Sequence, residues 1–330
     1  MTRKRISSDY LYDLINGVLR TEVLKASLKL DLFSTISQGL NSAERISKAR
    51  GWSKEAITLL LDSLSSLGFL KKKEDFYSLP KTSEVFFVRG SEGYGGGFIL
   101  SVIDSEVSER LVEAIEKGKR RICDVLEEEF EVLWAQDASL ESRRHSRLKE
   151  SLWMWRKAGI KPEKKRKLLV LDLASGCGIK SFVLAERNPL VRIVCVDRGV
   201  VLEVARKLAS KLKILDQVEF VEGDILEMDF GDEKYDAVLL GQLTYYWSLD
   251  QVRNVFEKVR RSLKEGGRFL LHVSMADGKL SPEASLDAIF CFLFSEEGRL
   301  HGFSDYKRIL EEKGFLRVEK YAPKVLVAYK

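Results

Sequence analysis

The sequence predicts an α/β protein, with a doubly wound sheet of seven strands in its second half and a smaller helical domain before it. Two observations predict the sheet. Short apolar runs ending in small or acidic residues recur after residue 167, as in parallel strands covered on both faces. Amphipathic helical stretches separate these runs, which is typical of β-α-β units. A third observation, helical periodicity in the first hundred residues, predicts the helical domain.

The composition predicts a soluble globular protein. The chain has 330 residues, of which 45% are hydrophobic and 32% charged, and its net charge of +5 gives no electrostatic case for nucleic-acid binding. The four cysteines show no CxxC spacing, so we expect free thiols in a reducing cytoplasm. No apolar stretch approaches about 18 residues and the N-terminus has no apolar signal core, so we expect no membrane insertion and no export.

The N-terminal segment has the pattern of a winged helix. Apolar residues recur at helical spacing from Tyr10 to Leu30, and Ser42 begins a short second helix. Ser53 caps a third helix that Gly68 ends, and residues 69–77 predict a hairpin around a KKKED turn. The charged residues of the would-be recognition helix carry a net charge of minus one, whereas phosphate contacts need Lys and Arg. We therefore expect no nucleic-acid partner.

Several helices are predicted between this module and the sheet. We place a winged-helix-like domain at residues 1–97, a helical connector at 98–160 and a nucleotide-binding domain at 161–330. The connector ends in the cluster containing Met154 and Trp155, which is either helix core or a wall of the substrate pocket. The basic run 161–167 is predicted to be a solvated linker.

The bend after the first core strand predicts a nucleotide site. Asp172, Ala174, Gly176 and Gly178 fall on alternate positions, so an acid leads three residues with little or no side chain. Such a bend lets a ligand lie against main-chain N–H groups at the start of a helix. The predicted strands are 168–173, 191–196, 217–221, 236–241, 268–274, 315–321 and 324–329.

Two later acids distinguish this site from a dinucleotide site. Gly176, Gly178 and Ser181 are a near miss to the GxGxxG fingerprint of dinucleotide enzymes. The second strand ends in Asp197, about 20 residues on, where a carboxylate would take ribose hydroxyls. The third strand is followed by Asp224, which places another acid at the same edge. A dinucleotide enzyme does not require that acid.

Together, DLASGCG, Asp197 and the triplet GDI resemble the class I S-adenosylmethionine-dependent methyltransferases. The resemblance implies that Ala174 to Gly178 carry the methionine part, Asp197 holds the ribose, and Asp224 with Ile225 holds the adenine. The candidate cofactor-binding residues are Asp172, Ala174, Ser175, Gly176, Gly178, Asp197, Asp224, Ile225 and Gly241.

The order of the N-terminal module and these motifs is similar to the plant-type and bacterial small-molecule O-methyltransferases. This resemblance implies a Rossmann-like methyltransferase sheet with one antiparallel strand. It also implies a homodimer formed through the N-terminal domain, in which each subunit contributes to its partner's substrate pocket.

The resembling family carries a His-Asp-Trp triplet whose His is the general base. In this sequence Tyr245 and Tyr246 replace the His and the Asp, and only Trp247 remains. The family's Gly-x-Glu-Arg-Thr stretch, whose Glu orients that His, has Leu300 in place of the Glu. Tyr ionises near pH 10, so as a base at neutral pH it is unfavourable by roughly 4 kcal/mol. His301 is the alternative candidate for the base.

We therefore expect catalysis by positioning and desolvation, with Tyr245 donating or accepting a hydrogen bond. Alignment of the reacting groups alone can lower the activation barrier by about 7–11 kcal/mol. The apolar segment Ala284–Glu296 is either core or dimer interface, and it offers Phe290 and Phe294 as lining for an aromatic or polyketide-like substrate. The candidate pocket residues are Met154, Trp155, Tyr246, Phe290 and Phe294. His272 is predicted to be a core or substrate-facing residue, and no residue cluster has metal-ligand spacing.

These observations predict an S-adenosylmethionine-dependent methyltransferase acting on a small molecule, with O-methylation favoured by resemblance. Methylation of carbon, nitrogen or sulfur is one alternative. A non-catalytic S-adenosylmethionine-binding or winged-helix regulatory protein is another, although the binding loop and both downstream acids are intact.

Overall fold

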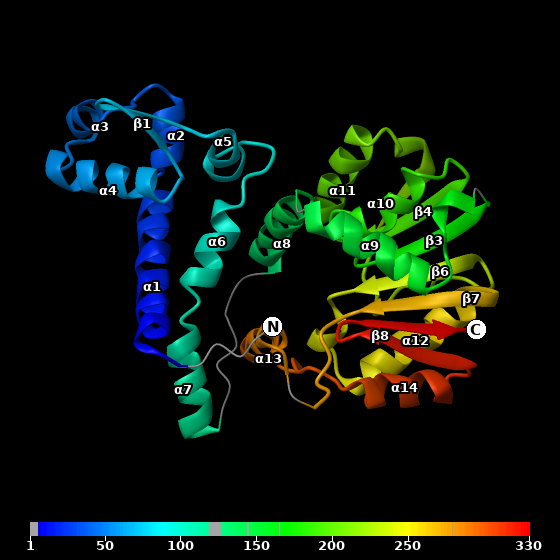
Figure 1. Ribbon diagram of the computed structural model, residues 1–330. Coiled ribbons are helices and arrows are strands. Elements are labelled where there is room, and N and C mark those ends of the chain that lie inside the picture. Colours follow the sequence, from blue (N-terminus) through cyan, green and yellow to red (C-terminus); the bar gives the residue numbers. More distant parts are fainter. Residues whose placement is uncertain (1–5, 119–126, 144, 165, 279) are drawn as a thin grey trace. The chain divides into compact units, whose positions relative to one another are not determined.

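The computed structural model describes residues 6–118, 127–143, 145–164, 166–278 and 280–330. The chain forms two compact units, Met1–Ser105 and Glu106–Lys330 (Figure 1). Helix α6 (Gly96–Ile103) contacts α1 (Ser8–Lys29) and belongs to the first unit, so this boundary lies after residue 105 rather than after residue 97. A separate connector over residues 98–160 stays a prediction.

The first unit contains the helices and the hairpin that the sequence predicts. Ser42 and Ser53 cap their helices as expected, each accepting a backbone N–H of the first turn. The hairpin differs from the prediction, because Leu70 is buried in the core and the lysines form the first strand, with Glu74 in the left-handed region at the turn. The remaining elements are α2 (Leu32–Ser37), α3 (Ala43–Arg50), α4 (Lys54–Ser66), β1 (Lys71–Lys73), β2 (Phe76–Ser78) and α5 (Lys81–Phe87).

The second unit is built on one sheet of seven strands in the order β5-β4-β3-β6-β7-β9-β8. Strand β9 runs antiparallel to both of its neighbours, and the other pairings are parallel. This arrangement confirms the predicted sheet with one antiparallel strand. The strands are β3 (Leu168–Leu173), β4 (Val191–Asp197), β5 (Val218–Glu222), β6 (Tyr235–Gly241), β7 (Leu263–His272), β8 (Arg317–Ala322) and β9 (Val325–Tyr329).

Helices cover both faces of this sheet (Figure 1). One core layer lies between the sheet and α9 (His145–Lys157), α10 (Ile179–Ala185) and α11 (Gly199–Lys211). The other lies between the sheet and α12 (Leu249–Ser262) and α14 (Phe303–Glu312). Three further helices complete the unit: α7 (Val107–Lys117), α8 (Glu127–Glu141) and α13 (Pro282–Phe294).

The sequence predicts an amphipathic helix from Leu249 to Leu263 that Gly266 and Gly267 end. In the structure these two glycines lie inside strand β7. Helix α12 ends at Ser262, and the pairing of β6 with β7 jumps from Tyr235–Leu263 to Ala237–Arg268. The residues between form a bulge, in which Gly266 has φ 72° and a Cβ on Gly267 would lie 2.7 Å from a backbone oxygen. The glycines are needed for this bulge.

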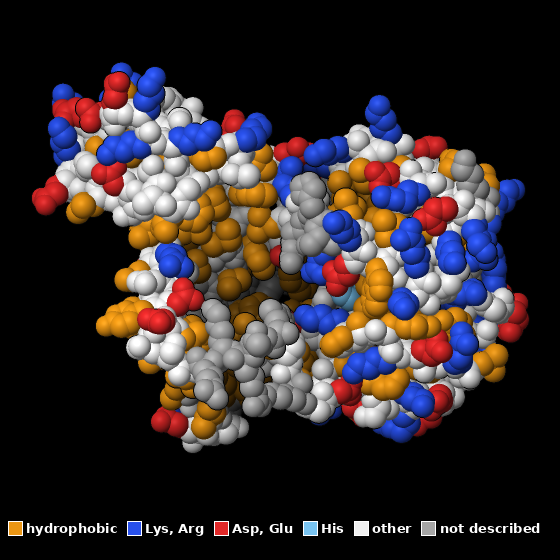
Figure 2. All heavy atoms as spheres, in the orientation of Figure 1, with side chains coloured by type: hydrophobic (Ala, Val, Ile, Leu, Met, Phe, Trp, Pro, Cys, Tyr) orange, Lys and Arg blue, Asp and Glu red, His pale blue; other side chains and the backbone are white. Residues whose placement is uncertain are grey.

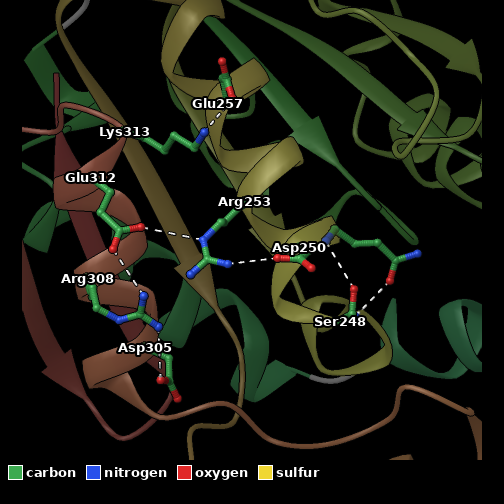
Figure 3. Close-up of polar contacts among 9 residues, drawn as sticks. Ser248, Asp250, Arg253, Glu257, Asp305, Arg308, Glu312 and Lys313 are labelled. Carbon is green, nitrogen blue, oxygen red and sulfur yellow. Dashed lines mark hydrogen bonds and ion pairs between the residues drawn. The ribbon is translucent and has the colours of Figure 1, made fainter.

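Helices α12 and α14 are joined by ion pairs on the surface (Figure 3). Arg253 Nε lies 3.6 Å from Glu312, and Lys313 Nζ lies 2.6 Å from Glu257. At the start of α12, Ser248 and Gln251 form a capping box in which each side chain accepts the other's backbone N–H. The box holds the beginning of α12 directly after the segment that carries Tyr245 and Tyr246.

The surface and the side-chain clusters bear on possible partners. Lys and Arg lie among Asp and Glu over the visible face of each unit (Figure 2). No helix in the described part of the chain has the length and apolarity needed to cross a membrane. Among the described residues, no group of three His, Cys, Asp or Glu side chains could hold a metal ion.

Ser248→Ala should lower the stability of the second unit because the Gln251 N–H in the first turn of α12 loses its acceptor. We expect a loss of about 1 kcal/mol in the free energy of unfolding and a melting temperature lower by about 2–4 °C. Ser285→Ala, which removes an exposed hydroxyl of α13, is the control and should leave melting unchanged. Equal effects of the two variants in a thermal melt would contradict the capping role.

Candidate cofactor and acceptor site

The bend between β3 and α10 has the conformation that its small residues predict. Ala174, Gly176 and Gly178 have φ of 51°, 56° and 75°, which places all three in the left-handed region. A Cβ on Gly178 would lie 2.3 Å from the ring of Phe182, so only glycine fits there. Ala174 and Gly176 are half-buried, whereas Ser175 is buried.

Asp197 holds this bend from the neighbouring strand. Its Oδ2 accepts the N–H of Gly176 at 2.8 Å, and its Oδ1 accepts the N–H of Arg198 at 2.8 Å. Burial raises the pKa of the carboxyl group, and the two amides oppose that rise. The sequence predicted this residue at the ribose position, and the structure brings it into contact with the glycine bend.

Asp172 lies beneath the bend and is 2% exposed. Its Oδ2 accepts the Ser181 hydroxyl at 2.5 Å. Burial raises the pKa of this carboxyl group to about 7, against the opposing effects of Ser181 and of the Lys180 charge. Asp172 therefore supports the loop from inside and does not present its carboxylate to a ligand.

Asp224 and Ile225 lie at the same edge of the sheet, after β5. Asp224 accepts the Leu226 N–H at 2.8 Å and lies 3.5 Å from the guanidinium of Arg198. Ile225 is buried in the core. The Gly223 N–H donates to the carbonyl of Asp197 at 3.2 Å, which ties this loop to the end of β4. The three predicted cofactor segments are thus adjacent.

A cluster of charged side chains that sequence reasoning missed lies beside the bend. Glu141 of α8 lies 3.1 Å from Arg147 and 3.7 Å from Lys180. Arg147 also lies 2.7 Å from Glu150, which in turn is 3.4 Å from His272. The His272 ring is the first cause, and Arg147 a further one, that lowers the pKa of Glu150 to about 2. One signal could have indicated Lys180, a charge in the otherwise apolar start of α10.

The two described histidine side chains occupy buried positions. His301 Nε2 lies 2.9 Å from the carbonyl oxygen of Trp247, so it donates there and joins two segments. This contact favours a structural role over the alternative of a base. His272, on the last residue of β7, is 1% exposed, which agrees with a core position. Burial lowers the pKa of both rings, so both are neutral at neutral pH.

Aromatic side chains gather on two neighbouring segments. The rings of Tyr245 and Tyr246 meet edge to face with centroids 4.7 Å apart, and those of Phe290 and Phe294 stack at 4.1 Å. The Ser295 hydroxyl donates to the carbonyl of Tyr246 at 3.1 Å, which joins α13 to the tyrosine segment. All four side chains are half-buried, as the lining of an aromatic pocket would be.

Met154 and Trp155 do not line a pocket. They are 1% and 0% exposed and belong to the core between α9, β3 and α10. The Trp155 indole donates to the carbonyl of Lys180 at 2.6 Å. The core alternative is therefore the correct one for these two residues, which support the cofactor loop because they pack against α10.

Comparison with known proteins identifies the family. A methyltransferase domain model matches residues 170–267, and an O-methyltransferase dimerisation domain model matches residues 12–89. The chain belongs to the S-adenosylmethionine-dependent O-methyltransferases. It is 23% identical to acetylserotonin O-methyltransferase of Rattus norvegicus, over 95% of this chain and 74% of that protein.

A second curated relative and one solved structure extend this comparison. The chain is 22% identical to 3-hydroxy-5-methyl-1-naphthoate 3-O-methyltransferase of Streptomyces sahachiroi, over 92% of this chain and 88% of that protein. The solved structure of N,N-8-amino-8-demethyl-D-riboflavin dimethyltransferase from Streptomyces davawensis matches with a TM-score of 0.76 and 17% identity. That match covers 98% of this chain and 99% of the other, and it shows the same fold.

The residues of the O-methyltransferase fit its cofactor. The half-buried bend at Ala174 and Gly176, the carboxylate of Asp197 and that of Asp224 meet at one edge, which suits a nucleoside with ribose hydroxyls. When bound, the sulfonium supplies an electrophilic methyl group. The individual roles of these residues toward the cofactor stay predictions.

Asp172→Asn should change how stability depends on pH. In the folded chain Asp172 stays protonated up to about pH 7, whereas its ordinary pKa is 3.8. Between these values the folded state binds more protons, so this residue makes stability fall as pH rises. Asn is neutral throughout, so the unfolding free energy of the variant relative to wild type should rise by roughly 4 kcal/mol from pH 4 to pH 8.

Urea denaturation at a series of pH values measures this difference. Asp216→Asn is the control, because Asp216 is exposed in the same unit. A difference between Asp172→Asn and wild type that stays constant across this pH range would show that the buried carboxyl is ionised throughout.

Proposed function

We propose that this enzyme transfers a methyl group to a small aromatic acceptor whose oxygen ionises without help from a protein base. The observation that carries the proposal is the replacement of the base by Tyr245 and Tyr246. Burial raises the pKa of Tyr245 well above 10, with the Tyr246 ring as a further cause, and burial raises that of Tyr246 as well. A phenol with so high a pKa stays protonated at neutral pH, so it cannot accept the proton of the acceptor.

The positions of the aromatic side chains support the choice of acceptor. The stacked Phe290 and Phe294 and the Tyr245–Tyr246 pair offer flat apolar faces within two segments that contact each other. A flat acceptor between such faces excludes water from the reacting oxygen. Methyl transfer depends on the approach of an oxygen to the methyl carbon, and alignment can contribute about 7–11 kcal/mol to it.

The relatives support the same class of acceptor. The names of the rat and Streptomyces sahachiroi enzymes specify O-methylation, and the latter names a hydroxyl group on a naphthoate. The riboflavin-derivative enzyme of the same fold methylates nitrogen by its name, so the fold alone does not select the atom. The experiment must therefore show which atom of the acceptor receives the methyl group.

The first test is methyl transfer from radiolabelled S-adenosylmethionine to a panel of phenols, naphthols, carboxylic acids, aromatic amines and thiols. We expect labelled methyl ethers from the phenols and naphthols of lowest pKa. Labelled amines or thioethers in their place would move the reaction to another atom. Cofactor binding with no product from any acceptor would favour the non-catalytic alternative.

Tyr245→Phe should retain the rate of methyl transfer to an acidic naphthol within about threefold, because no proton moves to Tyr245. Tyr246→Phe is the matched control at the neighbouring ring. The measurement is kcat from pH 6 to pH 9 with one acceptor. A hundredfold loss that is restricted to Tyr245→Phe and absent at high pH would make Tyr245 the base.

We also propose that the enzyme is a homodimer formed through its N-terminal domain. The matched dimerisation domain includes most of α1, and the first half of this helix exposes a run of apolar side chains. A contiguous exposed apolar surface of this kind is typical of an interface. The residues are Leu11, Tyr12, Leu14, Ile15, Val18 and Leu19, each 50% to 66% exposed.

Charges on this face should dissociate the dimer. We expect light scattering to give twice the chain mass of 37.7 kDa for the wild type and the chain mass for Ile15→Asp with Val18→Asp. Leu59→Asp, at a 64% exposed leucine of α4, is the control. A double variant that still has the mass of a dimer would place the interface elsewhere.

A further inference from the structure

Two side chains of opposite charge lie close to the two glycines that border the cofactor site. Glu141 Oε2 lies 4.0 Å from the position that a Cβ on Gly176 would take. Lys180 Nζ lies 3.4 Å from the corresponding position on Gly241. Glu141 comes from α8, Lys180 from the start of α10, and Gly241 from the end of β6. Neither charged residue belongs to the glycine motif itself.

Among the described residues the ammonium group of Lys180 has one ion pair, with Glu141, and its charge also acts on Asp172 and Asp197. Its side chain is 9% exposed, and its ion pair with Glu141 spans 3.7 Å, which is beyond hydrogen-bonding distance. A buried ammonium group is unfavourable unless it is paired and hydrogen-bonded. The Trp155 indole donates to the Lys180 carbonyl and anchors the backbone of this residue.

His272 provides a second observation, because one nitrogen of its buried ring lacks a partner within the described residues. The register pairs His272 with Gly241, so the ring lies on the strand next to the glycine that Lys180 covers. The ring is 1% exposed, its Nε2 lies 3.4 Å from the Glu150 carboxylate, and its Nδ1 makes no hydrogen bond within the described residues. Buried polar atoms of this kind normally have a partner.

The charges of the cluster match a zwitterion. Arg147 lies between Glu141 and Glu150 and contacts both, so it fixes the Glu141 carboxylate in place. With Lys180, these four side chains are two carboxylates and two cations, and the acidic side chains of Asp137, Asp172 and Asp197 also act on the two cations. A ligand with one ammonium and one carboxylate group can enter without leaving an excess of either sign.

We propose that Lys180 and Glu141 bind the amino-acid end of S-adenosylmethionine. The ammonium group of Lys180 takes the α-carboxylate of the cofactor, and the carboxylate of Glu141 takes its α-ammonium group. The Lys180–Glu141 pair of the free protein is exchanged for these two contacts when the cofactor binds. This proposal rests on the cofactor and is independent of the acceptor.

Calorimetry with three nucleosides separates the two contacts. S-adenosylhomocysteine carries both charges, its decarboxylated form carries only the ammonium group, and 5′-methylthioadenosine carries neither. We expect Lys180→Met to lower the affinity for S-adenosylhomocysteine about tenfold to a hundredfold, which is the usual effect of losing a charged hydrogen bond. The affinity of the same variant for the other two nucleosides should stay within about twofold of that of the wild type.

Glu141→Gln should show the complementary pattern. We expect it to lower the affinity for both S-adenosylhomocysteine and its decarboxylated form about tenfold, and to leave the affinity for 5′-methylthioadenosine unchanged. Lys207→Met, at an exposed position on α11, is the control for loss of one positive charge. Melting curves of all variants show whether each remains folded.

Three outcomes would overturn the proposal. Equal weakening of all three nucleosides by Lys180→Met would show that the ion pair only supports the loop. Unchanged affinity for S-adenosylhomocysteine in both variants would place the amino-acid end elsewhere. An equal loss of affinity in Lys207→Met and Lys180→Met would show that the change in net charge, and not a contact of Lys180, lowers the affinity. Failure of the wild type to bind S-adenosylhomocysteine would refute the cofactor itself.

Discussion

The rest of the site depends on one backbone constraint, the left-handed bend that follows β3. Ala174 is held at φ 51°, a conformation that is uncommon for a residue with a side chain. The carboxylate of Asp197 stabilises the bend by accepting the Gly176 N–H, so the strain of one loop is compensated from the neighbouring strand. The same carboxylate lies at the proposed ribose position. In the proposed ribose role, this one side chain would couple cofactor binding to the conformation of the loop, and a substitution at Asp197 would change both.

The charged groups around this bend illustrate a conflict between stability and binding. Asp172 is held in a place where its pKa rises to about 7, and Lys180 is buried with a distant partner. Apolar residues at these positions would give a more stable core, because buried charges are unfavourable unless fully paired. Charges that are incompletely satisfied in the free protein remain available to a ligand. On the proposal that Lys180 and Glu141 bind the amino-acid end of the cofactor, the incompletely paired charge of Lys180 is the part of the site that meets the carboxylate of the ligand.

Much of the fold could be predicted from the sequence, because the signals that define it are local. The strand Leu168–Leu173 and the helix capped by Ser53 were predicted with correct limits, since apolar runs and cap residues act over a few positions. Gly266 and Gly267 were misread because a bulge and a helix stop have the same residues, and only the pairing with β6 distinguishes them. The partners of Lys180 could not be predicted either. Glu141 lies 39 positions away on a helix whose packing no local pattern reveals.

The loss of the usual base becomes intelligible from the contacts of the segment that carries Tyr245. His301 donates to the Trp247 carbonyl, Ser295 donates to that of Tyr246, and the Arg299 N–H donates to that of Tyr245 at 2.9 Å. Three successive carbonyls are thus held by the segment that follows α13, so the two aromatic segments form one rigid wall. In an enzyme with a base, such rigidity aligns a proton acceptor. Under the proposed mechanism the wall would instead align the acceptor oxygen, and selectivity would follow from which oxygens are already ionised when they reach it.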